Sequence, residues 1–158
     1  MSIPDTVVEY LDRSEVNYQI HRHSHTATSL ESAYSAHVPA EQIAKGVLLW
    51  DEIGYVLAVI PASNSLDIDT LNYLIDRRLE LATEEELSDV FVDCAIGAVP
   101  AVGWAYHVPT VVDEELLEQP TLYFESGDHE ELIMVDEADF ETLMEGSEYG
   151  RLSNVEPG

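Results

Sequence analysis

Residues 43–60 read IAKGVLLWDEIGYVLAVI and indicate the centre of the fold. Two apolar runs, at 43–50 and 55–60, flank the short segment 51–54, which contains a glycine. Apolar runs of this length around a Gly-containing turn are typical of a β-hairpin with buried strands. The stretch therefore predicts two paired central strands. Lys45, the only lysine of the chain, lies inside the first of them.

Helical patterns lie on both sides of this hairpin. Residues 67–75 place apolar side chains at helical spacing behind Asp67, a favourable N-cap. Thr83 and Glu86 have the spacing of a capping box, in which each side chain bonds the other residue's backbone N–H. By the same criteria we expect helices at residues 3–16, 28–37, 67–75 and 83–91, and a last helix that Asp136 caps, with Phe140, Leu143 and Met144 as its apolar stripe.

Further strand patterns occur along the rest of the chain. They lie at residues 17–22, 78–81, 111–113, 121–125 and 132–135, with a short helical segment at 114–118. Strands that are joined partly by hairpins and partly through helices predict a mixed sheet. We therefore expect an α/β fold with about six or seven short strands in a mixed sheet and helices around it. GxGxxG, P-loop and CxxC motifs do not occur, so the cofactor classes that they bind lack their main signal.

The chain has 158 residues, 46% of them hydrophobic. This length favours one domain with a core of its own. The sequence becomes polar, with glycine and proline, from Gly146 onward. We therefore expect a single domain at 1–145 and a loose C-terminal tail at 146–158.

The single cysteine and the length of the apolar runs indicate the cellular compartment of the protein. Cys94 is the only cysteine, and the first residues show neither a basic segment nor an apolar segment of a signal peptide. The longest apolar runs are much shorter than the roughly 20 residues that span a bilayer. The sequence therefore predicts a cytoplasmic protein without a membrane partner.

The charge of the chain is strongly negative, with 32 acidic and 6 basic residues and a formal net charge of -26. Such a charge repels polyanions and argues against DNA as a partner. An RNA substrate would need a local grip, for which Arg22 and the pair Arg77–Arg78 are the candidates, or delivery by another protein. Alternatively, the acidic surface only keeps the protein soluble in a salty cytosol.

Lys45 is the first candidate for chemistry. An ammonium inside an apolar strand loses hydration, so it either lowers its pKa or bonds a carboxylate or a ligand oxygen. This favours a reactive site that is organised around Lys45. The alternative is a strand lysine that reaches solvent or pairs with one of the many acids.

A long irregular segment at 93–109 is the second candidate, because such loops are often functional. It contains Gly97, Pro100 and Gly103. Glycine allows close approach of the backbone and proline stiffens it, so N–H groups here are suited to polarising an ester carbonyl. His129, at a turn between two strands, is suited to orienting a water or a ribose hydroxyl, unless it is merely exposed.

Other site types have less support. His21, His23 and His25 share one face if their strand continues, and such a trio can bind zinc, but no cysteine is near. A GxSxG motif is absent, and Cys94 follows Asp93, whose charge raises the pKa of a thiol. We therefore expect neither a metal site nor a serine or cysteine nucleophile.

Taken in order, several segments resemble the YbaK/ProX-like family of aminoacyl-tRNA editing domains, some of which are inserted in or appended to prolyl-tRNA synthetases. The resemblance covers about residues 3 to 145. It rests on the segments YQIH (18–21), HTA (25–27), PAEQIAKGVLL (39–49), VIPA (59–62), GAVPAVG (97–103), VDE (112–114) and ESGDHEELI (125–133).

The resemblance implies a mixed sheet curled into a partial barrel, and an aminoacyl-tRNA deacylase that acts in trans. Its substrate is the ester between a small, wrongly attached amino acid and the 3′ ribose of tRNA. No cofactor and no metal is implied. The partners implied are the 3′ end of aminoacyl-tRNA and, for delivery, an aminoacyl-tRNA synthetase or an elongation factor.

The resemblance also assigns site residues. Lys45 matches the family residue most tied to activity, which fixes the aminoacyl moiety near the scissile ester. The other residues implied are for substrate binding: Gly97, Ala98, Val99 and Pro100 in the loop, His129 at the pocket wall, and Thr26.

Two positions depart from the family loop. Many members have a glycine directly before the first glycine and a second proline, where this chain has Ile96 and Ala101. The departures leave the amino acid that is removed open. Two other functions also stay open: a binding module of the same fold for a small ligand or protein, and a hydrolase of another small ester or amide.

Overall fold

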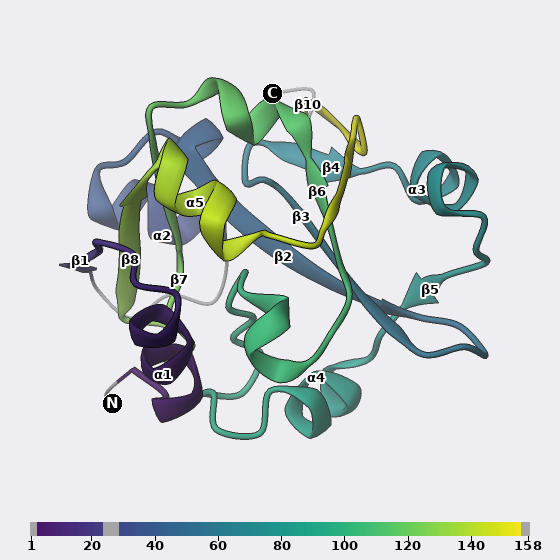
Figure 1. The fold of residues 1–158 in the computed structure, drawn as a ribbon, viewed down its shortest axis with the longest axis horizontal. Coiled ribbons are helices and arrows are strands. Elements are labelled where there is room, and N and C mark those ends of the chain that lie inside the picture. The colour runs from purple at the N-terminus through teal and green to yellow at the C-terminus, as the bar shows by residue number, and fades with distance from the viewer. Residues whose placement is uncertain (1–2, 24–28, 156–158) are drawn as a thin grey trace.

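A computed structural model describes residues 3–23 and 29–155, and one large sheet dominates it (Figure 1). Its strands follow the order β1-β8-β7-β2-β3-β6-β9, with β5 paired to β2, and β10 and β4 form a separate small sheet. The strands are β1 (Gln19–Arg22), β2 (Ile43–Trp50), β3 (Tyr55–Pro61), β4 (Asn64–Leu66), β5 (Glu80–Leu81), β6 (Thr110–Asp113), β7 (Thr121–Glu125), β8 (Glu131–Asp136), β9 (Glu148–Gly150) and β10 (Ser153–Val155).

Helices cover the sheet. The α-helices are α1 (Asp5–Arg13), α2 (Ser29–Ala36), α3 (Ile68–Ile75), α4 (Glu84–Val90) and α5 (Glu137–Leu143), and the 3₁₀ helices are η1 (Ala40–Gln42), η2 (Gly103–Tyr106) and η3 (Glu114–Glu118). The predicted caps are confirmed: Asp67 accepts the N–H of Thr70 at 3.1 Å, and Thr83 and Glu86 form the capping box. None of the helices in the described part of the chain is long and apolar enough to cross a membrane.

The predicted central hairpin is confirmed. β2 and β3 pair antiparallel from Ala44 opposite Pro61 to Trp50 opposite Tyr55. The Asp51 side chain closes the turn by accepting the N–H groups of Ile53 and Gly54. β2 pairs parallel with β7, and β3 with β6, so the sheet is mixed as predicted. With eight strands it is larger than the six or seven expected.

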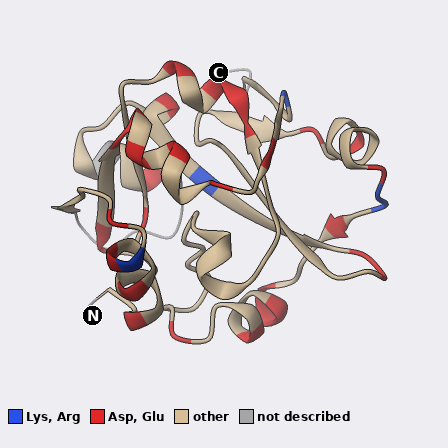
Figure 2. Ribbon diagram, in the orientation of Figure 1, with Lys and Arg blue, Asp and Glu red and all other residues tan. Residues whose placement is uncertain are grey.

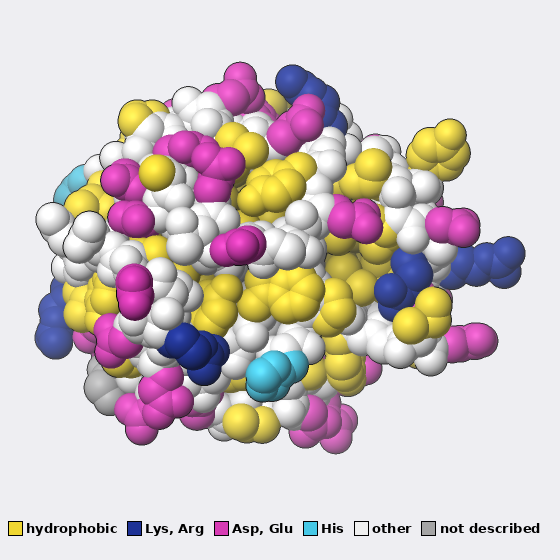
Figure 3. All heavy atoms as spheres, viewed as in Figure 1, with side chains coloured by type: hydrophobic (Ala, Val, Ile, Leu, Met, Phe, Trp, Pro, Cys, Tyr) yellow, Lys and Arg dark blue, Asp and Glu magenta, His cyan; other side chains and the backbone are white. Residues whose placement is uncertain are grey.

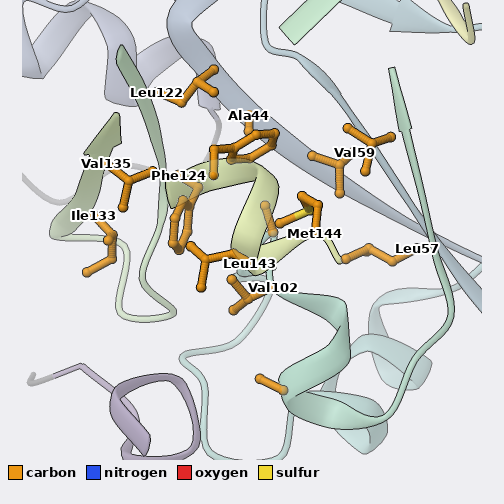
Figure 4. Packing of buried hydrophobic residues seen from close by; sticks show 14 of the residues in the cluster. Ala44, Leu57, Val59, Val102, Leu122, Phe124, Ile133, Val135, Leu143 and Met144 are labelled. Carbon is orange, nitrogen blue, oxygen red and sulfur yellow. The ribbon is translucent and has the colours of Figure 1, made fainter. Parts of the chain in front are cut away.

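The side chains of β2 alternate between two cores. Ala44 and Leu48 face the first core, which is covered by α1, α5 and η2 and in which Phe124, Leu143 and Met144 pack together (Figure 4). Ile43, Val47 and Leu49 face the opposite side of the sheet. There Ile43 packs with apolar residues of α2, and Leu49 packs with apolar residues of α3.

The C-terminal segment differs from the loose tail that the sequence predicts. β9 pairs parallel with β6, and β10 pairs antiparallel with β4. Leu152 between them is fully buried. The buried carboxylate of Asp113 accepts the N–H of Leu152 at 3.1 Å and the hydroxyl of Ser153 at 2.5 Å. The buried side chain of Leu152 and the buried carboxylate of Asp113 thus hold the mostly polar C-terminal segment in place.

Candidate functional site

Lys45 lies half-buried in β2, on the second face of the sheet. Its ammonium donates to the backbone carbonyl of Asn64 at 3.2 Å. The Asn64 side chain is itself buried and donates to Glu115 Oε2 at 2.7 Å and to Ser153 Oγ at 3.0 Å. The lysine is therefore anchored to a hydrogen-bonded cluster that joins β4, η3 and β10.

The end of β7 lies beside Lys45. The parallel register places Ala44 opposite Phe124, so the next residues, Lys45 and Glu125, project to the same face of the sheet. Glu125 is mostly buried, and this burial raises the pKa of its carboxyl group. Backbone N–H groups of Gly127 and His129 bond the same carboxylate, at 3.0 and 3.3 Å, and partly offset that shift.

The Gly/Pro loop contacts β2 at Gly46, the residue after Lys45, on the face of the strand opposite to the Lys45 side chain. A Cβ atom at Gly46 would lie only 2.9 Å from Val99 Cγ1, so the loop passes directly over this glycine. Gly97 has a positive φ of 78°, a conformation that favours glycine. Of the two departures from the family loop, Ile96 exposes its side chain and Ala101 is fully buried in the first core.

His129 lies in the turn between β7 and β8, as the sequence predicts. Its exposed fraction is only 8%, so the interpretation as an exposed turn residue is wrong. The imidazole Nε2 lies 2.7 Å from the carbonyl oxygen of Ile96, and Nδ1 lies 3.5 Å from Glu125 Oε1. The turn is held by Asp128, whose buried Oδ1 accepts from Ser126 Oγ and from two backbone N–H groups.

The turn of His129 contacts the Gly/Pro loop at two places. The N–H of Ala95 donates to the carbonyl of Gly127 at 2.7 Å, and the imidazole of His129 contacts the carbonyl of Ile96. A Cβ atom at Gly97 would lie 3.9 Å from His129 Nε2. The structure thus brings the 97–100 loop, His129 and the strand of Lys45 into one region. Thr26 lies outside the described residues.

The described residues of the histidine trio and the cysteine do not form a metal or nucleophile site. The imidazole of His21 contacts the carbonyl of Ala36 at 3.2 Å and the ring edge-on of Tyr123, while His25 lies outside the described residues. Burial raises the pKa of the Cys94 thiol to about 12, and nearby acids add to the shift, so the predicted direction is confirmed. Groups of three potential metal ligands are absent from the residues that the structure describes.

The sequence does not indicate two further residues of this region. Glu125 ends a strand, and its role depends on the register between β7 and β2, which the sequence does not reveal. Asn64 looks like an ordinary residue at the start of a short strand. The only sequence signal for either is polarity next to an apolar run.

Comparisons with known proteins show the family and the fold. The sequence matches the aminoacyl-tRNA editing domain family over residues 23–143. A search of curated proteins finds no match. The fold resembles the crystal structure of a "putative trans-editing enzyme for prolyl tRNA synthetase", at 24% identity and a TM-score of 0.81, over 97% of this chain and 99% of that chain.

Two further structures share the fold. The hypothetical protein APE2540 is 22% identical, with a TM-score of 0.83 over 95% of this chain and 100% of that chain. A putative signal transduction protein from Marinobacter aquaeolei VT8 is 21% identical, with a TM-score of 0.78. That match covers 96% of this chain but 31% of the other, so the same fold also occurs as a part of a longer protein.

Proposed function

Because the chain belongs to the aminoacyl-tRNA editing domain family, we propose that it is an aminoacyl-tRNA deacylase that acts in trans on tRNA carrying a wrongly attached small amino acid. The observation that carries this proposal is that the Gly/Pro loop contacts β2, the strand that holds the only lysine. Lys45 lies in β2 next to Gly46, and Gly46 is the point at which Val99 of the loop contacts the strand.

In this proposal the ester is hydrolysed by positioning rather than by a protein nucleophile. Lys45 fixes the aminoacyl moiety, and the backbone of the 97–100 loop contacts the carbonyl and the terminal ribose. The N–H of Ala98 already donates to Ala95, whereas no group in the described part of the chain accepts from the N–H of Gly97. Gly97 therefore supplies the donor that polarises the carbonyl while a held water attacks it.

The charge of the protein bears on how tRNA reaches this site. Acidic residues occur on most helices and loops, whereas Lys and Arg are few (Figure 2). On the face shown in Figure 3, acidic side chains are likewise spread widely. We therefore propose a cytoplasmic enzyme that contacts only the 3′ end of its substrate and receives it from an aminoacyl-tRNA synthetase or an elongation factor.

The test is the deacylation rate on tRNAs charged with alanine, serine, proline or cysteine, for the wild type and Lys45→Ala. We expect the wild type to deacylate one of them and Lys45→Ala to lose that activity while its circular dichroism spectrum is unchanged. Arg151→Ala is the matched control, because it removes an exposed cation that pairs with Glu114 away from the loop. This control is expected to keep full activity.

Unchanged hydrolysis by Lys45→Ala would rule out the role of the lysine. If the wild type deacylates none of the four tRNAs, the net charge of -26 favours the second function, a binding module of the same fold for a small ligand or a protein.

A further inference from the structure

The contacts around His129 point to a second role, for Glu125. The carbonyl oxygen of Ile96 only accepts hydrogen bonds, so the imidazole Nε2 at 2.7 Å must carry a proton and donate it. The other ring nitrogen, Nδ1, lies 3.5 Å from Glu125 Oε1, and both side chains are largely buried. Glu125 thus faces the nitrogen whose state decides which tautomer the ring adopts.

The tautomer of His129 controls the loop through one peptide unit. The carbonyl of Ile96 and the N–H of Gly97 belong to the same peptide group, which is planar and trans, so they point in opposite directions. When His129 draws the carbonyl toward the turn, the N–H of Gly97 points away from the turn. This is the N–H that has no acceptor in the described part of the chain.

We propose that Glu125 is a positioning residue of the deacylation site, which acts through His129 to orient the Ile96–Gly97 peptide toward the substrate carbonyl. This inference rests on the proposed function. Glu125 touches no reacting atom in this arrangement. It places the backbone donor that does, because the proton that its carboxyl group shares with Nδ1 lets Nε2 keep its own proton for the carbonyl of Ile96.

One proton is shared by the pair. With Nε2 protonated, Nδ1 is either protonated and faces a carboxylate, or unprotonated and faces a protonated carboxyl group. Loss of that proton at high pH would leave a carboxylate against the lone pair of Nδ1, which repels it and loosens the ring. Burial raises the pKa of Glu125, which favours keeping the proton in the pair.

The groups around the pair are acids, a neutral thiol and two cations. Asp128 from the same turn is buried, and its Oδ2 has no partner in the described part of the chain. Cys94 from the adjoining loop stays protonated because of its raised pKa. Arg22 of β1 is engaged with Glu131 of β8 at 3.4 Å, and the backbone of His23 bonds that of Glu130. Lys45 on β2 is the neighbouring cation on the same face.

Two substitutions separate positioning from structure. Glu125→Gln keeps an oxygen for the N–H groups of Gly127 and His129 and offers an amide donor to Nδ1, so the Nε2–H tautomer no longer needs the shared proton. Glu125→Ala removes both. We expect kcat of Glu125→Ala to fall by up to about 100-fold with a smaller change in KM, since displacement of a positioned group costs this much.

Glu125→Gln is expected to retain most of the activity and to change the pH profile. After subtraction of spontaneous hydrolysis, wild-type kcat should decline when rising pH removes the proton that the pair shares, and Glu125→Gln should lack this decline. Glu118→Gln, an exposed acid on η3, is the control and should follow the wild type. Wild-type kcat in Glu125→Ala, or coinciding pH profiles of wild type and Glu125→Gln, would overturn the inference.

A measurement on the free protein distinguishes the role of Glu125 from the proposed deacylase function. In ¹⁵N NMR spectra of the free protein, recorded at the pH of the activity assay, Nε2 of His129 should be protonated in the wild type and in Glu125→Gln, whereas Glu125→Ala should show a mixture of the two tautomers. A bare Nε2 with protonated Nδ1 in the wild type contradicts the inference even if the protein is an active deacylase. Absence of deacylation with a protonated Nε2 refutes the proposed function instead.

Discussion

At the scale of single residues, hydrogen bonds to backbone carbonyls fix the direction of two polar side chains of the site. Lys45 and His129 each lie against a backbone carbonyl, at Asn64 and Ile96. A carbonyl accepts a hydrogen bond, so it fixes the direction of these side chains. Both groups are thereby pre-oriented before any ligand binds.

Cys94 gives a prediction about reactivity. Its pKa of about 12 means that at pH 8 only about one thiol in 10,000 is ionised, and the thiolate is the reactive form. We expect the native protein to react with iodoacetamide or a disulfide reagent far more slowly than the same protein in urea, measured by mass spectrometry. Labelling of the native protein at the rate of an exposed cysteine would contradict the burial seen here.

Some residues of the region were accessible to sequence reasoning and others were not. Lys45 stands out in the sequence because a cation within an apolar strand is unusual, and His129 stands out because it lies in a turn between two strand patterns. Glu125 gains its place only from the parallel register of β2 and β7, and Asn64 from the pairing of β4 with β10. Such non-local registers leave no local pattern.

At the scale of elements, the C-terminal strands β9 and β10 are packed parts of the fold, and β10 supports the site. Ser153 of β10 accepts from Asn64 and donates to Asp113, and the carbonyl of Asn64 accepts a hydrogen bond from the ammonium of Lys45. β9 continues the main sheet beside β6. The segment after Gly146 is therefore connected to the lysine by an unbroken set of hydrogen bonds.

This connection predicts the effect of Leu152→Ala. Leu152 is fully buried in the second core, so its truncation should lower the free energy of unfolding by about 2–5 kcal/mol, measured by urea denaturation. Val155→Ala is the control, because Val155 in β10 is exposed, and it should change stability by less than about 0.5 kcal/mol. Equal stability of both variants would show that the segment is not packed as described.

Local chemistry explains which elements the sequence predicts well. The capping box at Thr83 and the cap at Asp67 depend on residues three positions apart, and both were found where expected. β9 and β10 are three residues long and mostly polar. Their pairing depends on buried Asp113, which lies far away in the sequence, so polarity suggested a loose tail instead.

At the scale of the whole molecule, the few cations are partly engaged. Arg22, Arg77 and Arg151 each pair with an acid, at Glu131, Asp51 and Glu114. The guanidinium of Arg77 holds the pKa of Asp51 well below its usual range. Of the three arginines that are candidates for phosphate contacts, Arg77 is thus bound to the turn of the β2–β3 hairpin. The side chain of Arg22 is largely exposed, and Arg78 is exposed.

The net charge predicts an unusual salt dependence. Proteins that neutralise phosphates lose affinity for nucleic acids as salt rises, because binding releases counterions. A chain of charge -26 repels tRNA instead, and salt screens this repulsion over a distance that shrinks from about 10 Å at 0.1 M to about 3 Å at 1 M. We therefore expect KM for aminoacyl-tRNA to fall as KCl rises from about 0.05 to about 0.5 M. An aminoacylated adenosine without phosphates is the control substrate, and its KM should stay nearly constant. If KM for the tRNA rises with salt instead, contacts of exposed arginines with phosphates outweigh the overall field, and delivery by a second protein is unnecessary.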